Sequence, residues 1–311
     1  MPDPVPILLD CDPGHDDAMA LLLALASPEV ELLGVTTVAG NQTLPKTTAN
    51  ALRVLEFAGR DDIPVAAGAD RPLVRVPAVA QDVHGDTGLD GPDLPPPRGT
   101  PIDAHAVHFL AERLRGAGRP VTLVPVGPLT NVALLLAQQP GIELHIERIV
   151  LMGGAIAEGN VTPAAEFNIW ADPEAAARVF ASGIDLTMVG LDVTHKAQLT
   201  HEHAARLRAS GRTGALVADL HAFYARFHRE VYGFEGAPIH DAVAVGHVVA
   251  PGMLETRERY VAIECGSELC RGRTVVDLWR RTGEPPNAHV GTDIDAEAFL
   301  ELFVGRLGGL G

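Results

Sequence analysis

The chain has 311 residues, of which 47% are hydrophobic and 21% are charged. This composition is typical of a globular protein with a large core and excludes a disordered chain. The formal net charge of −16, with only 24 lysines and arginines, argues against nucleic acid or an anionic membrane as the main partner. A small neutral or cationic ligand suits this charge better.

The cysteines and the N-terminal residues indicate the cellular compartment. Cys11, Cys265 and Cys270 are odd in number and unlike a disulfide scaffold. The N-terminus lacks a basic segment followed by an apolar stretch and a cleavage site. The longest apolar stretch, Ala18 to Ala26, is far too short to span a bilayer. We therefore expect a cytoplasmic protein.

The first predicted strand, Val5 to Leu9, leads through the turn Pro13-Gly14 into a predicted helix over Ala18 to Ala26. Four carboxylates lie within eight residues of this junction: Asp10, Asp12, Asp16 and Asp17. One aspartate before a helix is usually an N-cap. Four would repel one another unless a cation lay between them, and hard oxygen ligands favour Ca²⁺ or Mg²⁺. The segment therefore predicts a metal or polyol site.

Apolar strand-like runs then alternate with helical patterns. We expect strands at Val30 to Val38, Ile63 to Ala67, Val121 to Val126, Ile149 to Met152 and Leu186 to Leu191. We expect helices at Leu44 to Phe57, Ala104 to Arg115, Thr130 to Gln138 and Pro173 to Ser182. This alternation predicts a single α/β domain over residues 1–311, with an open, doubly wound, mostly parallel sheet and helices on both faces.

Ligands of such sheets bind beyond the carboxyl ends of the strands, so the polar residues after each strand are candidates. They are Asn41, Gln42, Thr43 and Asn131, and, in a long loop after Met152, Glu158, Asn160, Glu166, Phe167, Asn168 and Asp172. For Gln42, Thr43 and Asn131, turn formation is an equal explanation. Glu166 and Asn168 favour function, because loops of this length are usually functional or disordered.

A further polar pair, His240 and Asp241, precedes an apolar helix expected over Ala242 to Val249. A helix cap at Asp241 and a buried, hydrogen-bonded imidazole at His240 explain the pair as well as function does. A histidine beside a carboxylate at a helix entrance is also a suitable proton donor next to a metal.

Together these motifs resemble the inosine-uridine preferring nucleoside hydrolase family. The resemblance covers nearly the whole chain and rests on Asp10-Cys11-Asp12-Pro13-Gly14-His15-Asp16-Asp17, Gly40-Asn41, Glu166-Phe167-Asn168 and His240-Asp241. It implies an α/β enzyme, usually a homodimer or homotetramer, that binds Ca²⁺ and hydrolyses the N-glycosidic bond of ribonucleosides.

The resemblance also implies residue roles. Asp12, Asp17 and Asp241 correspond to carboxylate ligands of Ca²⁺, joined by the main-chain carbonyl of Val126. Val126 replaces a frequent Thr, which a backbone ligand tolerates. Asp12 is similar to the general base that activates water at the metal, with Asp10 behind it. The residues that correspond to substrate contacts are Asp16, nearest the 2′-hydroxyl, and Asn41, Asn160, Glu166, Phe167 and Asn168.

The reaction builds positive charge on the ribose ring, which carboxylates stabilise, and the departing base needs a proton. His240 is one candidate acid. His84 is the other, in a segment from Ala69 to Thr100 that is rich in Gly and Pro. This segment either closes over the substrate or is a plain surface loop.

Base preference depends on a helix expected over Leu216 to Tyr232. One face of it carries Tyr224, His228 and Tyr232 at four-residue intervals. These side chains either read the base or pack in an amphipathic face. The segments Gly233 to Asp241 and Thr274 to Asp277 look like the pyrimidine-preferring branch. That branch favours Thr and Gln where Tyr224 and His228 stand, which leaves broad or purine-tolerant activity open.

Two other protein classes share parts of the pattern. Asp10 and Asp12 at a strand end also match the nucleophile motif of Mg²⁺-dependent haloacid dehalogenase-like phosphatases, but Pro13-Gly14 interrupts that motif and the pair Asp16-Asp17 has no role in it. A non-catalytic nucleoside- or sugar-binding protein would use the same ribose contacts without hydrolysis.

Overall fold

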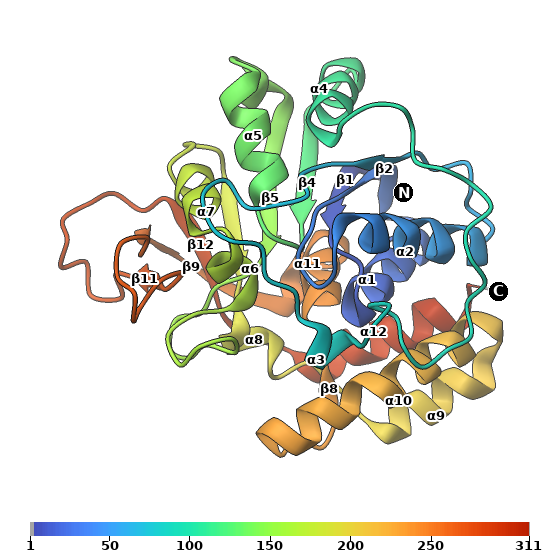
Figure 1. Ribbon diagram of the computed structural model, residues 1–311. Helices are drawn as coiled ribbons and strands as arrows, with labels where there is room; N and C mark the ends of the chain where they lie inside the picture. The colour runs from blue at the N-terminus through green and yellow to red at the C-terminus, as the bar shows by residue number, and fades with distance from the viewer. Residues whose placement is uncertain (1–2, 311) are drawn as a thin grey trace.

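The computed structural model describes residues 3–310, and its centre is an eight-stranded sheet (Figure 1). The strand order is β3-β2-β1-β4-β5-β6-β12-β9, and every pairing is parallel except that of β9 with β12. The strands are β1 (Val5–Cys11), β2 (Val30–Thr37), β3 (Val65–Ala67), β4 (Val121–Pro125), β5 (Ile146–Met152), β6 (Leu186–Val189), β9 (Leu254–Arg259) and β12 (Ala288–Ile294). The predicted open, mostly parallel sheet is confirmed.

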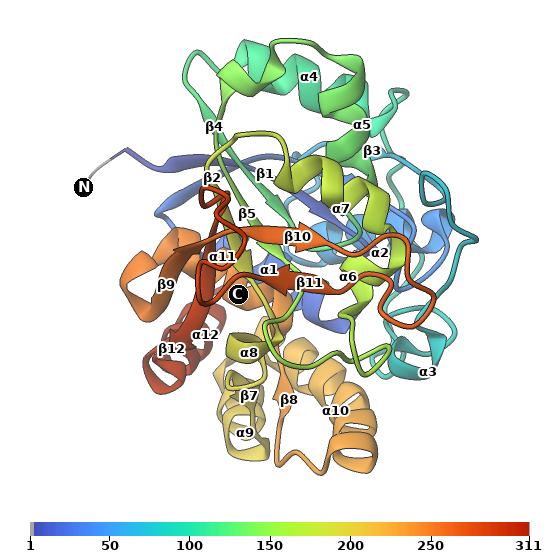
Figure 2. The same ribbon diagram turned by 90° about the vertical axis from the view of Figure 1, so that its left-hand side faces the viewer.

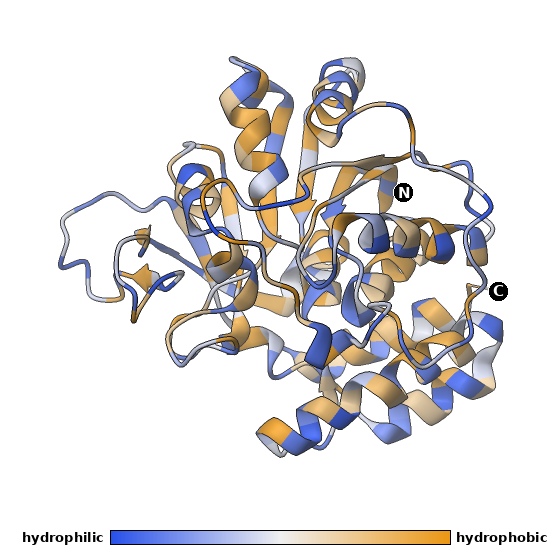
Figure 3. Cartoon of the chain, viewed as in Figure 1, coloured by the Kyte–Doolittle hydropathy of each residue, from blue (hydrophilic) through white to orange (hydrophobic). Residues whose placement is uncertain are grey.

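Helices cover both faces of this sheet. One face packs against α1 (His15–Ala26), α2 (Leu44–Phe57), α11 (His240–Val249) and α12 (Ala296–Gly308), and the other against α4 (Ala106–Gly116), α5 (Thr130–Gln138) and α7 (Pro173–Phe180). Alternate residues of β1 serve the two cores, because Ile7 and Leu9 pack on the first face and Leu8 on the second. The central strands are hydrophobic along most of their length (Figure 3), as strands covered on both faces are.

The remaining elements lie outside these layers. The helices α9 (His201–Ser210) and α10 (Arg212–Tyr232) pack on α12 (Figure 1). Two small antiparallel pairs join β7 (Gln198–Leu199) to β8 (Ala237–Pro238) and β10 (Val261–Ile263) to β11 (Thr274–Val276). The latter pair lies against α7 (Figure 2). Short helical turns complete the chain: α3 (Gln81–His84), η1 (Ile142–His145), α6 (Phe167–Ala171), α8 (Leu191–Thr194) and η2 (Pro251–Met253).

The direction in which strands are added reverses beside β1. The chain runs from β1 outward to β2 and β3, then returns to the other side of β1 with β4. Cys11 pairs with Thr37, so the residues that follow β1 and β2 meet at the same edge. Asp12 and Val126 follow β1 and β4 directly. They therefore lie at the switch point, where open α/β sheets bind ligands.

The predicted elements agree with the structure apart from their ends. The helices α2 and α5 have the predicted bounds, whereas β5 begins three residues before its predicted start, at Ile146. Among the longer elements, β9, β12, α9 and α12 were not predicted from the sequence. Within residues 3–310, no helix combines the length and the apolarity needed to cross a membrane.

Candidate active site

The aspartates of the N-terminal motif gather at the carboxyl end of β1. Asp16 and Asp17 lie in the first turn of α1, and both are buried with Asp12. The carboxylate of Asp17 accepts the backbone N–H of Gly14 over 2.9 Å and that of Asp12 over 3.0 Å. These bonds satisfy backbone donors at the start of the helix. The Asp17 side chain therefore both satisfies backbone donors at the helix start and belongs to the acidic cluster.

Asp241 reaches this cluster from α11. The N-cap of α11 is Ile239, so Asp241 lies inside the first turn and does not cap the helix. Carboxylate oxygens of Asp16, Asp17 and Asp241 lie within 4.8 Å of one another. Asp12 stands outside this group of three: its Oδ2 accepts the backbone N–H of Asn41 over 2.6 Å, and its buried Oδ1 has no partner within residues 3–310.

Burial of these carboxylates has an electrostatic cost. Burial raises the pKa of Asp12, Asp16 and Asp241 well above the usual range, and the charges of neighbouring aspartates raise it further. Burial also raises the pKa of Asp17, against the hydrogen bonds that Gly14 and Asp12 donate to it. A divalent cation would offset this repulsion, and the donors are all hard oxygens. The cluster, with the orphaned Oδ1 of Asp12, therefore fits Ca²⁺ or Mg²⁺.

Glycines in the neighbouring connections make room for the Asp12 carboxylate. A Cβ atom at Gly40, after β2, would overlap Oδ2 of Asp12, and one at Gly127, after β4, would overlap Oδ1. Both strands that flank β1 are thus followed by a residue without a side chain. The space for the Asp12 side chain at the switch point therefore depends on three segments of the sequence, those that follow β1, β2 and β4.

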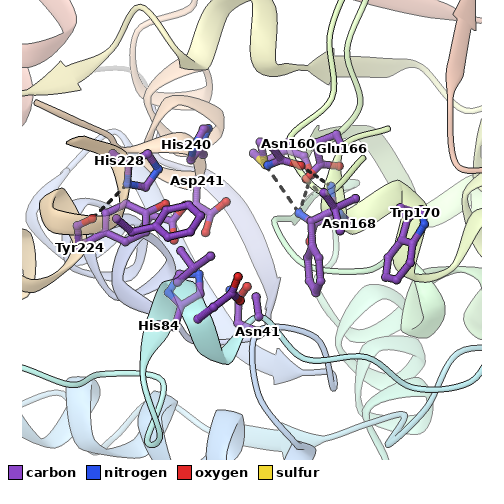
Figure 4. Close-up of a pocket in the computed structure, with 18 of the residues that line it drawn as sticks. Asn41, His84, Asn160, Glu166, Asn168, Trp170, Tyr224, His228, His240 and Asp241 are labelled. Atoms are coloured by element: carbon purple, nitrogen blue, oxygen red, sulfur yellow. Dashed lines mark hydrogen bonds between the residues drawn. The ribbon is translucent and has the colours of Figure 1, made fainter. Parts of the chain in front are cut away.

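A cavity of about 260 Å³ opens beside the cluster (Figure 4). Its lining includes most of the predicted site residues: Asp16, Asn41, His84, Val126, Asn160, Glu166, Phe167, Asn168, Tyr224, His228, Tyr232, His240 and Asp241. Asp12 and Asp17 are not among the lining residues, but both carboxylates accept hydrogen bonds from Asn41, which is one of them. The fold thus brings the predicted residues together, and their individual roles remain predictions.

The start of α6 forms one wall of the cavity. Glu166 caps this helix, accepts three backbone N–H groups and has a pKa that burial raises to about 6. Asn168 donates from Nδ2 to the carbonyl oxygens of Val126, over 2.8 Å, and Met152, over 3.2 Å. The carbonyl of Val126, a predicted metal ligand, therefore already accepts one hydrogen bond and has one lone pair left.

The opposite wall is built by α10. The ring of Tyr224 lies 5.4 Å from that of His84 and 4.4 Å from that of His228, measured between centroids. The Tyr232 hydroxyl donates to the carbonyl oxygen of Asn160 over 3.3 Å and so links α10 to the loop before α6. The predicted face of α10 therefore does line the site.

The two candidate acids come from different elements. At the end of α3, His84 accepts the backbone N–H of His15 at Nδ1 over 3.2 Å. In α11, His240 Nδ1 lies 2.8 Å from Oγ1 of Thr194. Burial lowers the pKa of both imidazoles well below the usual range. Both imidazoles are therefore neutral at pH 7, and either one has to take up a proton before it can protonate a leaving base.

Two other polar candidates support the site from outside the cavity. Asn131 accepts the backbone N–H of Ala69 and donates to Oδ1 of Asp10, both over 2.8 Å. Gln42 donates to the carbonyl oxygen of Gly85 over 2.9 Å. Asn131 therefore holds the start of the segment that carries His84, and Gln42 holds the same segment directly after His84. Both contacts agree with a structural role for these two residues.

Several lining residues were not predicted as site residues, and among them His195, Trp170 and Phe227 carry aromatic rings. Phe227 lies three residues after Tyr224 in α10, so the helical spacing contained a signal for it. The other two belong to the short segments α6 and α8–β7, which are too short to show a periodicity. His195 Nδ1 lies 3.0 Å from Oε1 of Glu158, and this contact ties the loop before α6 to the opposite wall.

Comparison with known proteins identifies the family. The family model described as "Inosine-uridine preferring nucleoside hydrolase" matches residues 7–301. The chain belongs to this family. It is therefore an enzyme, a nucleoside hydrolase, and the family is metal-dependent in general. This result argues against both the phosphatase and the non-catalytic binding protein.

Individual relatives support the same conclusion over nearly the whole chain. Proteins named "Pyrimidine-specific ribonucleoside hydrolase RihA" are 54% identical over 304 residues in Shewanella sp. (strain ANA-3) and 51% identical over 305 residues in Citrobacter koseri. The matches cover 97% of this chain and 96% and 98% of those proteins. The solved structure "Purine-Preferring Ribonucleoside Hydrolase from Gardnerella vaginalis" is 33% identical, with a TM-score of 0.92 and 98% of both chains covered.

Proposed function

We propose that this nucleoside hydrolase splits pyrimidine ribonucleosides into ribose and the free base, with Ca²⁺ at Asp12, Asp17, Asp241 and the carbonyl oxygen of Val126. The observation that carries the proposal is the buried carboxylate cluster beside a cavity at the switch point of the sheet. The two pyrimidine-specific relatives, at 54% and 51% identity, favour pyrimidines over purines. Broad inosine and uridine activity is the alternative.

Asp12 is the proposed general base. When bound, a divalent cation supplies a Lewis acid that orients and acidifies a water molecule. Asp12 takes the proton of the attacking water on Oδ1, the oxygen without a partner in residues 3–310. The backbone N–H of Asn41 donates to the other oxygen, Oδ2, and thereby fixes the plane of the carboxylate.

The ribose contacts explain the direction of attack. Asp16, Asn41, Asn160, Glu166 and Asn168 are proposed to bind the hydroxyl groups. A ribose held in this way presents its anomeric carbon to the water beside Asp12, and this positioning contributes to the rate. As the C–N bond breaks, positive charge develops on the ring, and the carboxylates of Asp16 and Glu166 stabilise it.

The base leaves with the electron pair of the C–N bond and takes up a proton. His240 or His84 takes up a proton from solvent, transfers it as imidazolium to the departing base and returns to the neutral imidazole, while the hydroxyl part of the water bonds to the anomeric carbon. The proton held by Asp12 then returns to solvent and replaces the one that the histidine took up. Atoms and charge balance over the cycle.

A substrate panel tests the proposal. Release of ribose is measured for uridine, cytidine, inosine, adenosine and their 2′-deoxy forms, with Ca²⁺ and again after exhaustive chelation. Metal-dependent release from pyrimidine ribonucleosides, with little from the deoxy forms, is the expected result. Faster release from inosine would overturn the pyrimidine preference, and no release from any substrate would overturn the assigned chemistry.

Assembly and location complete the proposal. We expect a homodimer or homotetramer without nucleic-acid or membrane partners, acting in the cytoplasm. Light scattering of the purified protein measures the subunit number, and cell fractionation measures the location. A monomer at micromolar concentration would contradict the expected assembly.

A further inference from the structure

One ring nitrogen of His228 forms a hydrogen bond within the protein. Its Nδ1 lies 3.0 Å from the carbonyl oxygen of Tyr224, one turn earlier in α10. A carbonyl oxygen has no hydrogen to donate, so Nδ1 must carry the hydrogen of this bond. A neutral imidazole has a single ring hydrogen. The other nitrogen, Nε2, therefore has a free lone pair and acts only as an acceptor.

The surroundings of His228 keep it neutral and hold its ring in place. Burial lowers the pKa of His228 to about 4. The ring packs edge-on against Tyr224, with centroids 4.4 Å apart, and against Phe227, with centroids 5.5 Å apart. Phe234 lies nearly parallel to it at 6.5 Å. These aromatic neighbours and the Nδ1 hydrogen bond fix the direction of the Nε2 lone pair.

His228 also belongs to the lining of the cavity, on the wall that carries His240 and Asp241 (Figure 4). The centroids of the His228 and His240 rings are 6.1 Å apart. Within residues 3–310, the bond from Nδ1 is the only hydrogen bond of the His228 side chain. Nε2 is thus an acceptor at the cavity wall that can take a hydrogen bond from a ligand.

We propose that Nε2 of His228 selects bases that carry a ring N–H, and so makes the enzyme prefer uridine to cytidine. This inference rests on the proposed function, in which the cavity binds a pyrimidine ribonucleoside. Uracil has a hydrogen on ring atom N3, whereas cytosine has a lone pair there. Cytosine would place that lone pair against the one on Nε2, and a buried acceptor without a donor is costly.

The test compares uridine with 3-methyluridine, in which a methyl group replaces the N3 hydrogen, and with cytidine. In the wild-type enzyme, kcat/KM for uridine is expected to exceed that for 3-methyluridine by roughly ten- to a hundredfold. His228→Phe keeps the planar ring but removes the lone pair. It should lower kcat/KM for uridine by about tenfold and leave that for 3-methyluridine nearly unchanged, so that the preference shrinks. The preference for uridine over cytidine should shrink with it.

The matched control is His221→Phe, the same substitution on the same helix. His221 Nε2 lies 2.5 Å from the carbonyl oxygen of Leu199, and this side chain is not part of the cavity lining. The control should keep the wild-type substrate ratios. A second variant, His228→Leu, removes the same lone pair with a smaller side chain and should reproduce the loss of preference.

Two results would overturn the inference and leave the proposed function intact. One is a wild-type enzyme that hydrolyses uridine and 3-methyluridine equally well, a measurement that needs no variant. The other is an equal loss of both activities in His228→Phe, which would mean that the side chain only supports the fold. Absence of activity on every nucleoside would instead overturn the proposed function, and this inference with it.

Discussion

The backbone N–H of Asn41 donates a hydrogen bond to Oδ2 of Asp12 over 2.6 Å. Asp12 follows β1 and Asn41 lies four residues after β2, so the bond forms where two parallel neighbours end. The donor is main chain, and it therefore does not depend on the side chain at position 41. It leaves Oδ1 of Asp12 as the oxygen that can accept a proton.

We expect Asp12→Asn to reduce kcat by about 10²- to 10⁴-fold, the usual contribution of a general base. The amide oxygen can still accept the Asn41 N–H, so the fold should persist. Steady-state kinetics with uridine measure the loss of turnover. Calorimetric titration with ribose measures whether the folded variant still binds the sugar. Turnover at the wild-type rate would show that Asp12 is not the base.

A methyl group next to Asp12 should disturb the site more than the fold. Gly127→Ala places a Cβ against Oδ1 of Asp12, and we expect a loss of about 1–3 kcal/mol in stability with a large fall in kcat. Gly305→Ala is the control, since Gly305 is exposed in α12 and its Cβ would meet no atom within 4 Å. This control should gain about 0.5–1 kcal/mol and keep full activity. Equal kinetics in the two variants would contradict the argument.

Removal of metal should lower both activity and stability. Without a cation, the buried carboxylates of Asp16, Asp17 and Asp241 repel one another. Ca²⁺ at about 100 times its Kd should stabilise the fold by about 2.7 kcal/mol. Thermal unfolding with and without chelator measures this effect independently of catalysis. An unfolding midpoint that changes with neither chelator nor Ca²⁺ would argue against a cation site.

Leaving-group dependence separates the two candidate acids. A residue that protonates the base matters for inosine and uridine, whose bases leave poorly, and matters little for a nitrophenyl riboside. The variant of the true acid, His240→Ala or His84→Ala, should slow the nucleosides by about 10²- to 10⁴-fold and the activated riboside far less. If both variants slow all substrates alike, neither histidine is the acid.

Acid should destabilise the protein partly through His247 of α11. Burial, followed by the charges of Arg148 and His289, lowers the pKa of His247 from 6.5 to about 4. Above pH 6.5 the imidazole is neutral in both states. As the pH falls toward 4, the unfolded chain gains a proton that the folded chain does not, so stability is lost.

Denaturant unfolding at pH 7.5 and pH 4.5 measures this loss. His247→Leu should lose less stability over this interval than the wild type does, by on the order of 1–3 kcal/mol. His108→Leu changes an exposed histidine of α4 and should follow the wild type. Identical losses in all three proteins would exclude His247 as a source of the acid sensitivity.

Strong local patterns made much of the fold predictable. The helices α2 and α5 have the expected bounds because their amphipathic or apolar repeats begin and end at clear breaks in the sequence. By contrast, β12 was missed because polar residues such as His289 and Asp293 interrupt it, and only its pairing with β6 and β9 makes it a strand.

The amino-acid sequence alone established the doubly wound fold class, the acidic motif after the first strand and the resemblance to nucleoside hydrolases. These properties depend on residue types and spacings within short segments. The fold alone brings a carboxylate oxygen of Asp241 within 4.8 Å of those of Asp16 and Asp17, because Asp241 lies on a different helix, more than 200 residues along the chain. It also decided which nitrogen of His228 is the acceptor, since a tautomer depends on the hydrogen-bond partner that the fold supplies.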